Sequence, residues 1–140
     1  MKIIICCSIT AADEVLRVRD ALEKMGYSVE IPEGVKNKFL RVRTEISVSE
    51  KASDKIQHDL IKKYYEKIKL HDAILVVNPE KRGIKGYIGG NTLMEMGFGY
   101  VLNKKLYVLY PLPDIQYRPE LEAMQPIILN GELNKIVTTS

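Results

Sequence analysis

Ile3-Ile4-Ile5-Cys6-Cys7 is a continuous apolar run near the amino end of the chain. A run without polar alternation is typical of a strand buried on both faces of a parallel sheet. Apolar residues then recur at helical spacing from Thr10 to about Met25, and Gly26 ends this predicted helix. The segment 27–31 follows as a second short strand. The first thirty residues therefore predict a β-α-β unit.

The rest of the chain continues this alternation of strands and helices. We expect strands at 73–77, 106–110 and 127–129, a helix capped by Ser53-Asp54 that runs to about Leu70, a helix from Asn91 or Thr92 to Leu102, and helical turns at 120–124 and 133–136. Strands buried on both faces that alternate with helices indicate a doubly wound α/β fold with right-handed crossovers. We predict one flavodoxin- or Rossmann-like domain over residues 1–140, with a five-stranded parallel sheet in the order 2-1-3-4-5.

The composition is that of a soluble globular protein, with 46% hydrophobic and 28% charged residues. The longest apolar runs are far shorter than the roughly 20 residues that span a bilayer. Asp13 and Glu14 follow the first apolar run closely, so we expect no signal peptide and a cytoplasmic protein without a membrane partner. A net charge of +3 is too small to indicate nucleic-acid binding.

The connection 32–51 has no clear periodicity and carries a basic cluster formed by Lys36, Lys38, Arg41 and Arg43. Long connections in compact domains are more often functional than idle. The cluster is either a solvated loop or a mobile basic flap that helps to hold an anionic ligand. Partial alternation within 39–48 also leaves room for a short hairpin.

Neither a metal site nor a nucleotide cofactor is expected. Cys6 and Cys7 are neighbours that point to opposite faces of a strand, which favours two reduced thiols, and His58 and His71 stand thirteen positions apart without partners at ligand spacing. The turn 7–11 lacks the glycines of a dinucleotide fingerprint, and the chain has no Gly-Lys-Ser/Thr loop. We therefore do not expect a Rossmann oxidoreductase or a P-loop NTPase.

Ligands of doubly wound sheets bind beyond the carboxyl ends of the strands, where the strand order reverses. The loops that follow Cys7, Val77 and Tyr110 meet at this edge. Their polar and glycine residues are candidates for substrate binding, although each also fits an ordinary capping or turn role. These candidates are Ser8, Ile9, Asn78, Gly89, Gly90 and Asn91.

Glu95 admits two interpretations. Thr92 and Glu95 fit the spacing of a capping box, in which the glutamate bonds to the backbone at the start of its own helix. Alternatively, the bulky apolar neighbours of Glu95 desolvate its carboxylate and raise its pKa, as expected of a nucleophile or general acid.

Three segments resemble the nucleoside 2-deoxyribosyltransferase superfamily, which includes the 2′-deoxynucleoside 5′-phosphate N-hydrolases. They are Ile4-Ile-Cys-Cys-Ser-Ile9, Asp72-Ala-Ile-Leu-Val-Val77 and Glu95-Met-Gly-Phe-Gly-Tyr-Val-Leu-Asn-Lys-Lys105. The resemblance implies cleavage or transfer at the N-glycosidic bond of a (deoxy)nucleoside or its 5′-monophosphate. It further implies that Glu95 attacks the anomeric carbon, and that the protein is a homodimer or a higher homo-oligomer.

The chain departs from this family at several positions. Tyr64 stands where the family has an acid, which leaves Asp59 as the substitute. Ile4 replaces a tyrosine of the hydrolase branch, and Glu122 replaces a serine near the phosphate. An alternative hypothesis is therefore a non-catalytic nucleotide- or nucleoside-binding protein. A third is a subunit of a larger assembly without a small ligand.

Overall fold

The computed structural model of the chain describes residues 1–36 and 50–137, and it describes residues 50–59 by their backbone alone. The expected hairpin within 39–48 lies outside the described residues, as do Lys38, Arg41 and Arg43 of the basic cluster. That hairpin and the two interpretations of the cluster stay predictions.

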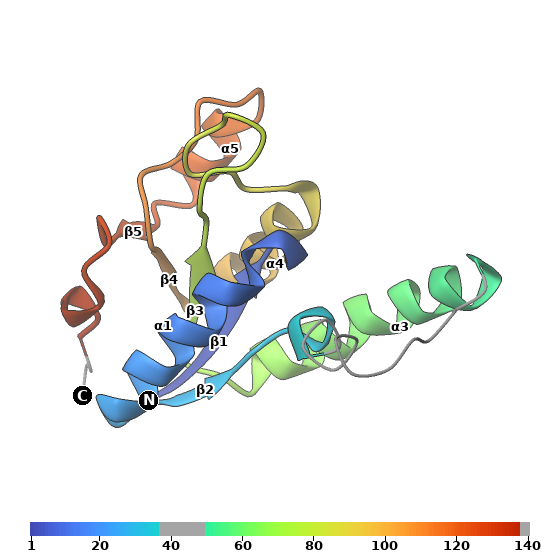
Figure 1. The fold of residues 1–140 in the computed structure, drawn as a ribbon, viewed down its shortest axis with the longest axis horizontal. Coiled ribbons are helices and arrows are strands. Elements are labelled where there is room, and N and C mark those ends of the chain that lie inside the picture. Colours follow the sequence, from blue (N-terminus) through green and yellow to red (C-terminus); the bar gives the residue numbers. More distant parts are fainter. Residues whose placement is uncertain (37–49, 138–140) are drawn as a thin grey trace.

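The described chain alternates strands and helices along its length (Figure 1). The strands form one sheet in the order β2-β1-β3-β4-β5, and every neighbouring pair is parallel. The predicted α/β fold and strand order are therefore confirmed. The elements are β1 (Lys2–Cys7), η1 (Ile9–Ala11), α1 (Ala12–Lys24), β2 (Ser28–Glu30), α3 (Glu50–Lys69), β3 (Ala73–Val77), α4 (Gly90–Val101), β4 (Lys105–Val108), α5 (Arg118–Ala123), β5 (Ile127–Ile128) and η2 (Leu133–Lys135).

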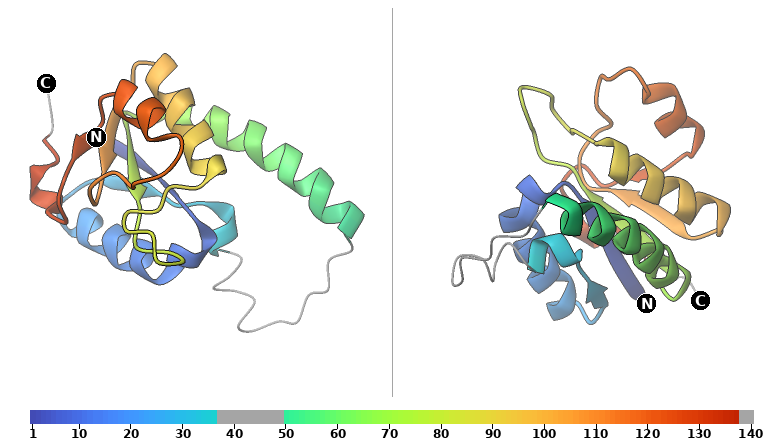
Figure 2. Two further views of the ribbon diagram at one scale, coloured as in Figure 1. Left: turned by 90° about the horizontal axis from the view of Figure 1, so that it is seen from above. Right: turned by 90° about the vertical axis from the view of Figure 1, so that its right-hand side faces the viewer.

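Helices cover both faces of the sheet, with α1 on one face and α3 and α4 on the other (Figures 1 and 2). Successive side chains of a strand point to opposite faces. Ile3 and Ile5 accordingly pack into the core beneath α1, whereas Ile4 and Cys6 pack against α3 and α4. The unbroken apolar run of β1 is thus explained by burial on both sides. Both cysteines are free thiols.

Helix boundaries differ from those predicted. The predicted first helix is divided into the 3₁₀ turn η1 and the α-helix α1, and α3 begins at Glu50, ahead of Ser53. α4 begins at Gly90, and its N-cap is Gly89 in extended conformation. Glycine is an accepted N-cap, but it leaves no side-chain signal in the sequence, so Thr92 was the more conspicuous candidate.

Gly99 lets α4 lie unusually close to β3. A Cβ atom at this position would lie 2.3 Å from Cδ1 of Ile74 and 3.1 Å from Cδ2 of Leu106. Ile74 is fully buried, so its side chain has little room to move aside. The distance between α4 and the sheet is therefore set by the absence of a side chain at Gly99.

We expect Gly99→Ala to lower the free energy of unfolding by about 1–3 kcal/mol, because the added methyl group overpacks the interface between α4 and β3. Gly97→Ala in the same helix is the matched control, since a Cβ there meets nothing within 4 Å. The control should be stabilised by up to about 1 kcal/mol through its higher helix propensity. Urea denaturation of both variants measures the difference, and equal stabilities would contradict the close packing.

Candidate active site

A pocket of about 360 Å³ opens at the carboxyl ends of β1 and β2. We call it the Glu95 pocket. Its walls come from the end of β1, the segment after β2, and the helices α3 and α4. It therefore lies at the sheet edge where ligands of doubly wound folds are expected. The described lining residues are Cys7, Ile9, Pro32, Glu33, Gly34, Leu60, Ile61, Tyr64, Asn91, Met94, Glu95 and Phe98.

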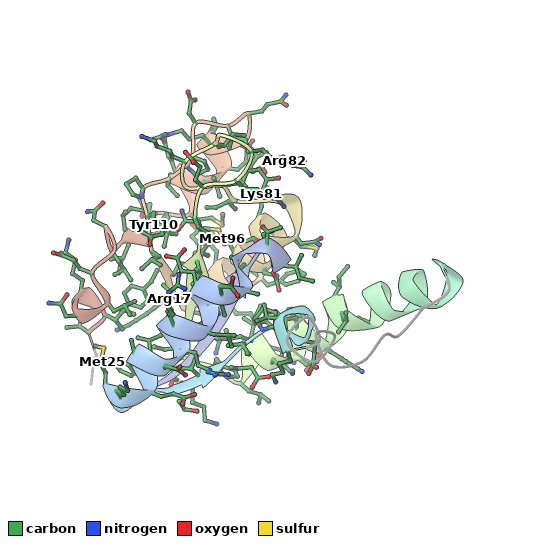
Figure 3. The ribbon with its side chains drawn as sticks, viewed as in Figure 1. Arg17, Met25, Lys81, Arg82, Met96 and Tyr110 are labelled. Carbon is green, nitrogen blue, oxygen red and sulfur yellow. The ribbon has the colours of Figure 1, made fainter. Side chains whose placement is uncertain are left out.

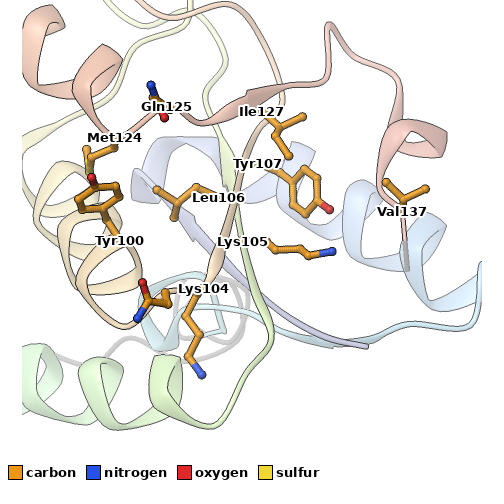
Figure 4. Close-up of a pocket in the computed structure, with 10 residues that line it drawn as sticks. Tyr100, Lys104, Lys105, Leu106, Tyr107, Met124, Gln125, Ile127 and Val137 are labelled. Atoms are coloured by element: carbon orange, nitrogen blue, oxygen red, sulfur yellow. The ribbon is translucent and has the colours of Figure 1, made fainter. Parts of the chain in front are cut away.

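Two other cavities lie elsewhere in the described structure. One, of about 480 Å³, lies at the amino end of β4 and includes Lys104, Lys105 and Tyr107 in its lining (Figure 4). It is at the opposite end of the strands from the edge that binds ligands in this class of fold. The other, of about 510 Å³, lies between the loops that follow β3 and β4. Glu95 lines neither of them.

Glu95 lies in the second turn of α4, which begins at Gly90. Asn91 and Phe98 line the same pocket, one turn before and one turn after it, so a single stripe of α4 faces the ligand space. The Glu95 side chain is half-buried, and its charge acts on Cys6, Cys7 and Tyr64. It forms no hydrogen bond or ion pair with any residue whose side chain the structure describes. Nothing in this part of the chain neutralises it.

The capping box expected from Thr92 and Glu95 is wrong. In such a box the first residue is the N-cap, and the glutamate is the third residue of the helix. Here Gly89 is the N-cap and Thr92 is already the third helical residue, with a buried side chain. Glu95 is therefore too far along α4 for its carboxylate to accept a hydrogen bond from the backbone N–H of the N-cap residue.

Burial raises the pKa of Glu95 to about 8, because the apolar walls of the pocket disfavour the charged carboxylate. The neighbouring thiol behaves differently. Burial, followed by the charge of Glu95, raises the pKa of Cys7 to about 12, so Cys7 stays protonated near neutral pH. Of these two groups, Glu95 is thus the one whose charge changes in the physiological range.

Tyr64 occupies the place where the family resemblance leads us to expect an acid. It lines the Glu95 pocket from α3, and its hydroxyl donates a hydrogen bond to the backbone carbonyl of Ile5. Burial is the main cause that raises the pKa of Tyr64. Tyr64 therefore anchors α3 to β1 and supplies no carboxylate. The side chain of Asp59, on the same helix, lies outside the described residues, so its catalytic role stays a prediction.

An ion-pair network fixes the wall that follows β2. Nζ of Lys67 on α3 lies 2.9 Å from Oε1 of Glu30 and 3.2 Å from Oε1 of Glu33. Nζ of Lys36 lies 3.1 Å from the same Glu30 oxygen. Exposed pairs contribute little singly, but a shared network holds the geometry of the segment more firmly. Glu33 is thus a second pocket carboxylate, and unlike Glu95 it is paired.

The other predicted residues divide into two groups. Ile9 and Asn91 line the Glu95 pocket. Ser8 lies directly between the lining residues Cys7 and Ile9 and caps η1, accepting a hydrogen bond from the backbone N–H of Thr10 at 3.4 Å. Gly89 and Gly90 form the start of α4 and do not line the pocket.

Asn78 does not contribute to the Glu95 pocket. Its side chain is fully buried, and Nδ2 donates to the carbonyls of Gly86 at 3.2 Å and Tyr110 at 3.1 Å. Oδ1 accepts from the backbone N–H of Tyr110 at 2.9 Å. The amide is engaged by the backbone of two loops, and the role of Asn78 in substrate binding stays a prediction.

Several lining residues were missed by the sequence reasoning. Pro32, Glu33 and Gly34 follow β2 directly, so the rule that ligands bind at carboxyl ends of strands would have included them. Met94 directly precedes Glu95 and Phe98 lies about one turn after it, and both were noted only as apolar neighbours. Tyr64 was noted only as a departure from the family.

Within residues 1–36 and 60–137, no cluster of three or more His, Cys, Asp or Glu side chains is arranged to bind a metal ion. Among the described helices, none combines the length and apolar character needed to cross a membrane.

Glu95→Gln should stabilise the protein increasingly as the pH rises. Between the ordinary glutamate pKa of 4.5 and about 8, the folded state keeps a proton that the unfolded state has lost. The wild-type free energy of unfolding therefore falls through this window, by at most about 1.4 kcal/mol per pH unit from this group. Urea denaturation from about pH 5 to about pH 8 should show the two proteins diverging.

Glu122→Gln is the control for the loss of one carboxylate, because Glu122 is exposed on α5 and ion-paired with Arg118 at 2.7 Å. This control should not reproduce the divergence. Parallel pH profiles for the wild type and Glu95→Gln would contradict a raised pKa.

Comparisons with known proteins identify structural neighbours only. No protein-family model and no curated protein sequence matches the chain. Among solved structures, a 2-deoxyribosyltransferase from Bacillus psychrosaccharolyticus is similar, with a TM-score of 0.59 and 18% identity over 87% of this chain and 81% of the other. The CMP N-glycosidase of Clostridium botulinum has a TM-score of 0.48 and 17% identity, over 91% of this chain and 85% of the other.

The first of these likenesses covers most of both chains, although its low identity limits the conclusion to the fold. The resemblance seen in the sequence is therefore confirmed at that level: the chain has the fold of a 2-deoxyribosyltransferase.

Proposed function

We propose that the protein cleaves or transfers the N-glycosidic bond of a nucleoside or a nucleoside 5′-monophosphate, with Glu95 as the nucleophile. One observation carries the proposal. Glu95 is a half-buried carboxylate without a described hydrogen-bond or ion-pair partner, in a pocket at the ligand-binding edge of the sheet. A group with a strongly perturbed pKa in such a pocket is a candidate for chemistry. The shared fold with a 2-deoxyribosyltransferase supports this class of reaction.

The chemistry suits a carboxylate. As the bond between the anomeric carbon and the base nitrogen breaks, positive charge develops on the sugar. A Glu95 oxygen forms a new bond to the anomeric carbon and gives a glycosyl ester. The bonding electron pair leaves with the base, which takes up a proton. Water or the nitrogen of a second base then attacks the same carbon and releases Glu95, which gives hydrolysis or transfer respectively.

The pocket favours the transition state over the resting enzyme. The apolar walls that destabilise a lone carboxylate also strengthen its attraction to the developing positive charge of the sugar. The ionised carboxylate, which the apolar walls destabilise in the free protein, is therefore stabilised by the sugar as the bond breaks. Asn91, on the same stripe of α4, is placed to hydrogen-bond a sugar hydroxyl or a base edge.

The remaining parts of the proposal come from the resemblance. Asp59 is proposed as the second acid, a homodimer or higher homo-oligomer as the assembly, and the cytoplasm as the location. The substitution of Tyr64 for the family acid favours a second candidate, a nucleotide- or nucleoside-binding protein that has lost turnover. Both candidates use the same pocket.

Release of free base separates the two candidates. The protein is incubated with deoxynucleosides, ribonucleosides and their 5′-monophosphates, with and without an acceptor base, and the base is followed by chromatography. We expect release or exchange of base in the wild type and a loss of at least about a hundredfold in Glu95→Ala. Glu23→Gln should retain full activity, because Glu23 is exposed on α1 and is not part of the pocket lining.

Tight binding of a nucleoside or nucleotide without turnover across the whole panel would favour the binding protein. Unchanged activity in Glu95→Ala would exclude Glu95 as the nucleophile, whatever reaction is found.

The pH dependence provides an independent test. Glu95 must be ionised to attack, and its pKa in the free protein is about 8. We therefore expect kcat/KM to rise roughly tenfold per pH unit below about pH 8 and to level off above it. Steady-state rates between about pH 5 and about pH 9 measure the profile. A plateau that already begins near pH 5 would contradict the raised pKa.

A further inference from the structure

A short β5 leaves a cavity at the amino end of β4. β5 pairs only with Tyr107 and Val108, so within the described structure Lys105 and Leu106 have no strand beside them on this edge of the sheet. The cavity of about 480 Å³ lies along this open part of β4 (Figure 4). We call it the Tyr107 pocket. Its volume is within the range of roughly 300–1,000 Å³ that is usual for small-molecule sites.

The Tyr107 pocket is separate from the Glu95 pocket. Among the described residues, the two pockets share no lining residue. Figure 3 shows the two ends of the molecule: Met25, the C-cap of α1, lies where the strands begin, and Lys81 and Arg82 lie on the loop after β3 at the other end. A ligand of the Tyr107 pocket is therefore a second ligand, and its binding does not depend on the proposed function.

One polar group in the Tyr107 pocket lacks a partner. Tyr107 is fully buried, and its hydroxyl has no hydrogen-bond partner among the residues that the structure describes. No other buried side-chain nitrogen or oxygen within residues 1–36 and 60–137 is left in this state. A buried hydroxyl without a partner destabilises a folded chain, and a ligand that accepts a hydrogen bond from it removes this effect.

The segment that ends at Val137 lies next to this hydroxyl. Burial raises the pKa of Tyr107, and the nearby backbone of Val137 lowers it, although the two groups do not form a hydrogen bond of normal geometry. Ile136 is buried, and its carbonyl accepts a hydrogen bond from the Tyr27 hydroxyl at 3.2 Å, whereas Val137 is 60% exposed. A shift of Val137 therefore gives a ligand access to the hydroxyl.

Lys105 lies on the same face of β4 as Tyr107. Residues two apart in a strand point to the same side, about 7 Å from each other. Ile127 is the partner of Tyr107 across the two strands, so its side chain lies on this face as well. The half-buried Lys105 thus brings a positive charge to the side of the pocket on which the Tyr107 hydroxyl lies (Figure 4).

The rest of the lining is suited to an apolar anion. Lys104 and Lys105 line the pocket, and no aspartate or glutamate does so in the part of the chain that the structure describes. Tyr100, Ile127 and Val137 also line it, although they are 51%, 49% and 60% exposed. Large apolar side chains that gather in a concave site and remain exposed are typical of a binding surface.

An aromatic ring with one carboxylate is complementary to both parts of the pocket. A carboxylate has two acceptor oxygens, which suits one hydroxyl donor and one ammonium donor. The ring packs against the exposed apolar side chains. We propose that the Tyr107 pocket binds an aromatic carboxylate, with the carboxylate held by Tyr107 and Lys105 and the ring against Tyr100 and Ile127.

Three compounds test this proposal: 2-naphthoate, its neutral amide 2-naphthamide, and acetate, which lacks the ring. Each is titrated by NMR into uniformly labelled wild type, Tyr107→Phe, Lys105→Gln and Lys63→Gln at constant pH and ionic strength. We expect the wild type to bind 2-naphthoate at least about tenfold more tightly than the other two compounds. The backbone N–H signals that move should be centred on residues 100–107 and 124–127.

Tyr107→Phe should have opposite effects on stability and on binding. It removes a hydroxyl without a partner, so urea denaturation should show the free variant to be at least as stable as the wild type. Its affinity for 2-naphthoate should nevertheless fall by about tenfold, because a donor to the carboxylate is lost. Lys105→Gln should weaken 2-naphthoate by about tenfold as well, and leave 2-naphthamide within about twofold.

Lys63→Gln is the matched control for net charge. Lys63 is exposed on α3 and lines none of the three cavities. This variant should bind all three compounds as the wild type does.

Several results would overturn the proposal. Equal affinities for 2-naphthoate and 2-naphthamide would show that the pocket does not recognise the anion. Unchanged affinity in Tyr107→Phe would exclude the hydroxyl as a donor, and equal losses in Lys105→Gln and Lys63→Gln would show a general charge effect. Failure of the wild type to bind 2-naphthoate, or signal changes centred on the Glu95 pocket, would equally overturn it.

Discussion

The buried amide of Asn78 holds together the loops that follow β3 and β4, and the first of these loops leads into α4. Its hydrogen bonds join the end of β3 to Gly86 and to the backbone at Tyr110. A buried amide that lost these partners would cost several kcal/mol, so the loops after β3 and β4 are held together strongly. Gly86 permits this closeness, because a Cβ there would lie 2.2 Å from the carbonyl oxygen of Pro111, and its φ is +69°. The turn at 81–84 lies within the loop that these contacts close, and α4 begins shortly after Gly86.

Local patterns predicted the sheet well. Each apolar run became a parallel strand because burial on both faces leaves a signal in consecutive residues, such as Ile3 to Cys7. The start of α4 was less predictable. Thr92 and Glu95 have the spacing of a capping box, whereas the true N-cap, Gly89, gives its helix no side chain to recognise. A one-turn error in this boundary would have given Glu95 a structural role that it does not have.

The candidate site could be predicted only in part. Glu95 stood out through the resemblance, and Ile9 and Asn91 through their place at the carboxyl edge. The pairing of Glu33 with Lys67 depends on a contact between distant segments, for which the sequence has no local pattern. Asn78 illustrates another limit: an asparagine at a strand end suits a ligand and a loop equally, and its contacts with the loop backbone have no local pattern in the sequence.

The two carboxylates that line the pocket are held in contrasting ways. Glu33 shares Lys67 with Glu30, whereas Glu95 faces the apolar walls without a described cation. Two carboxylates in one site can have different roles when their environments differ in this way. The paired Glu33 holds the shape of the wall through its contact with Lys67. The unpaired Glu95 has a raised pKa and no described partner that a ligand would have to displace.

The glycine at position 99 has a consequence beyond packing. It lies one helical turn after Glu95, so the same stripe of α4 carries the candidate nucleophile and the point of closest approach to β3. The position of the Glu95 carboxylate relative to the end of β1 thus depends on how closely the backbone of α4 packs against the sheet. It does not depend on a side chain that contacts a ligand. A homologous chain with a larger residue at this position should have α4 further from the sheet. Its pocket should then differ in depth.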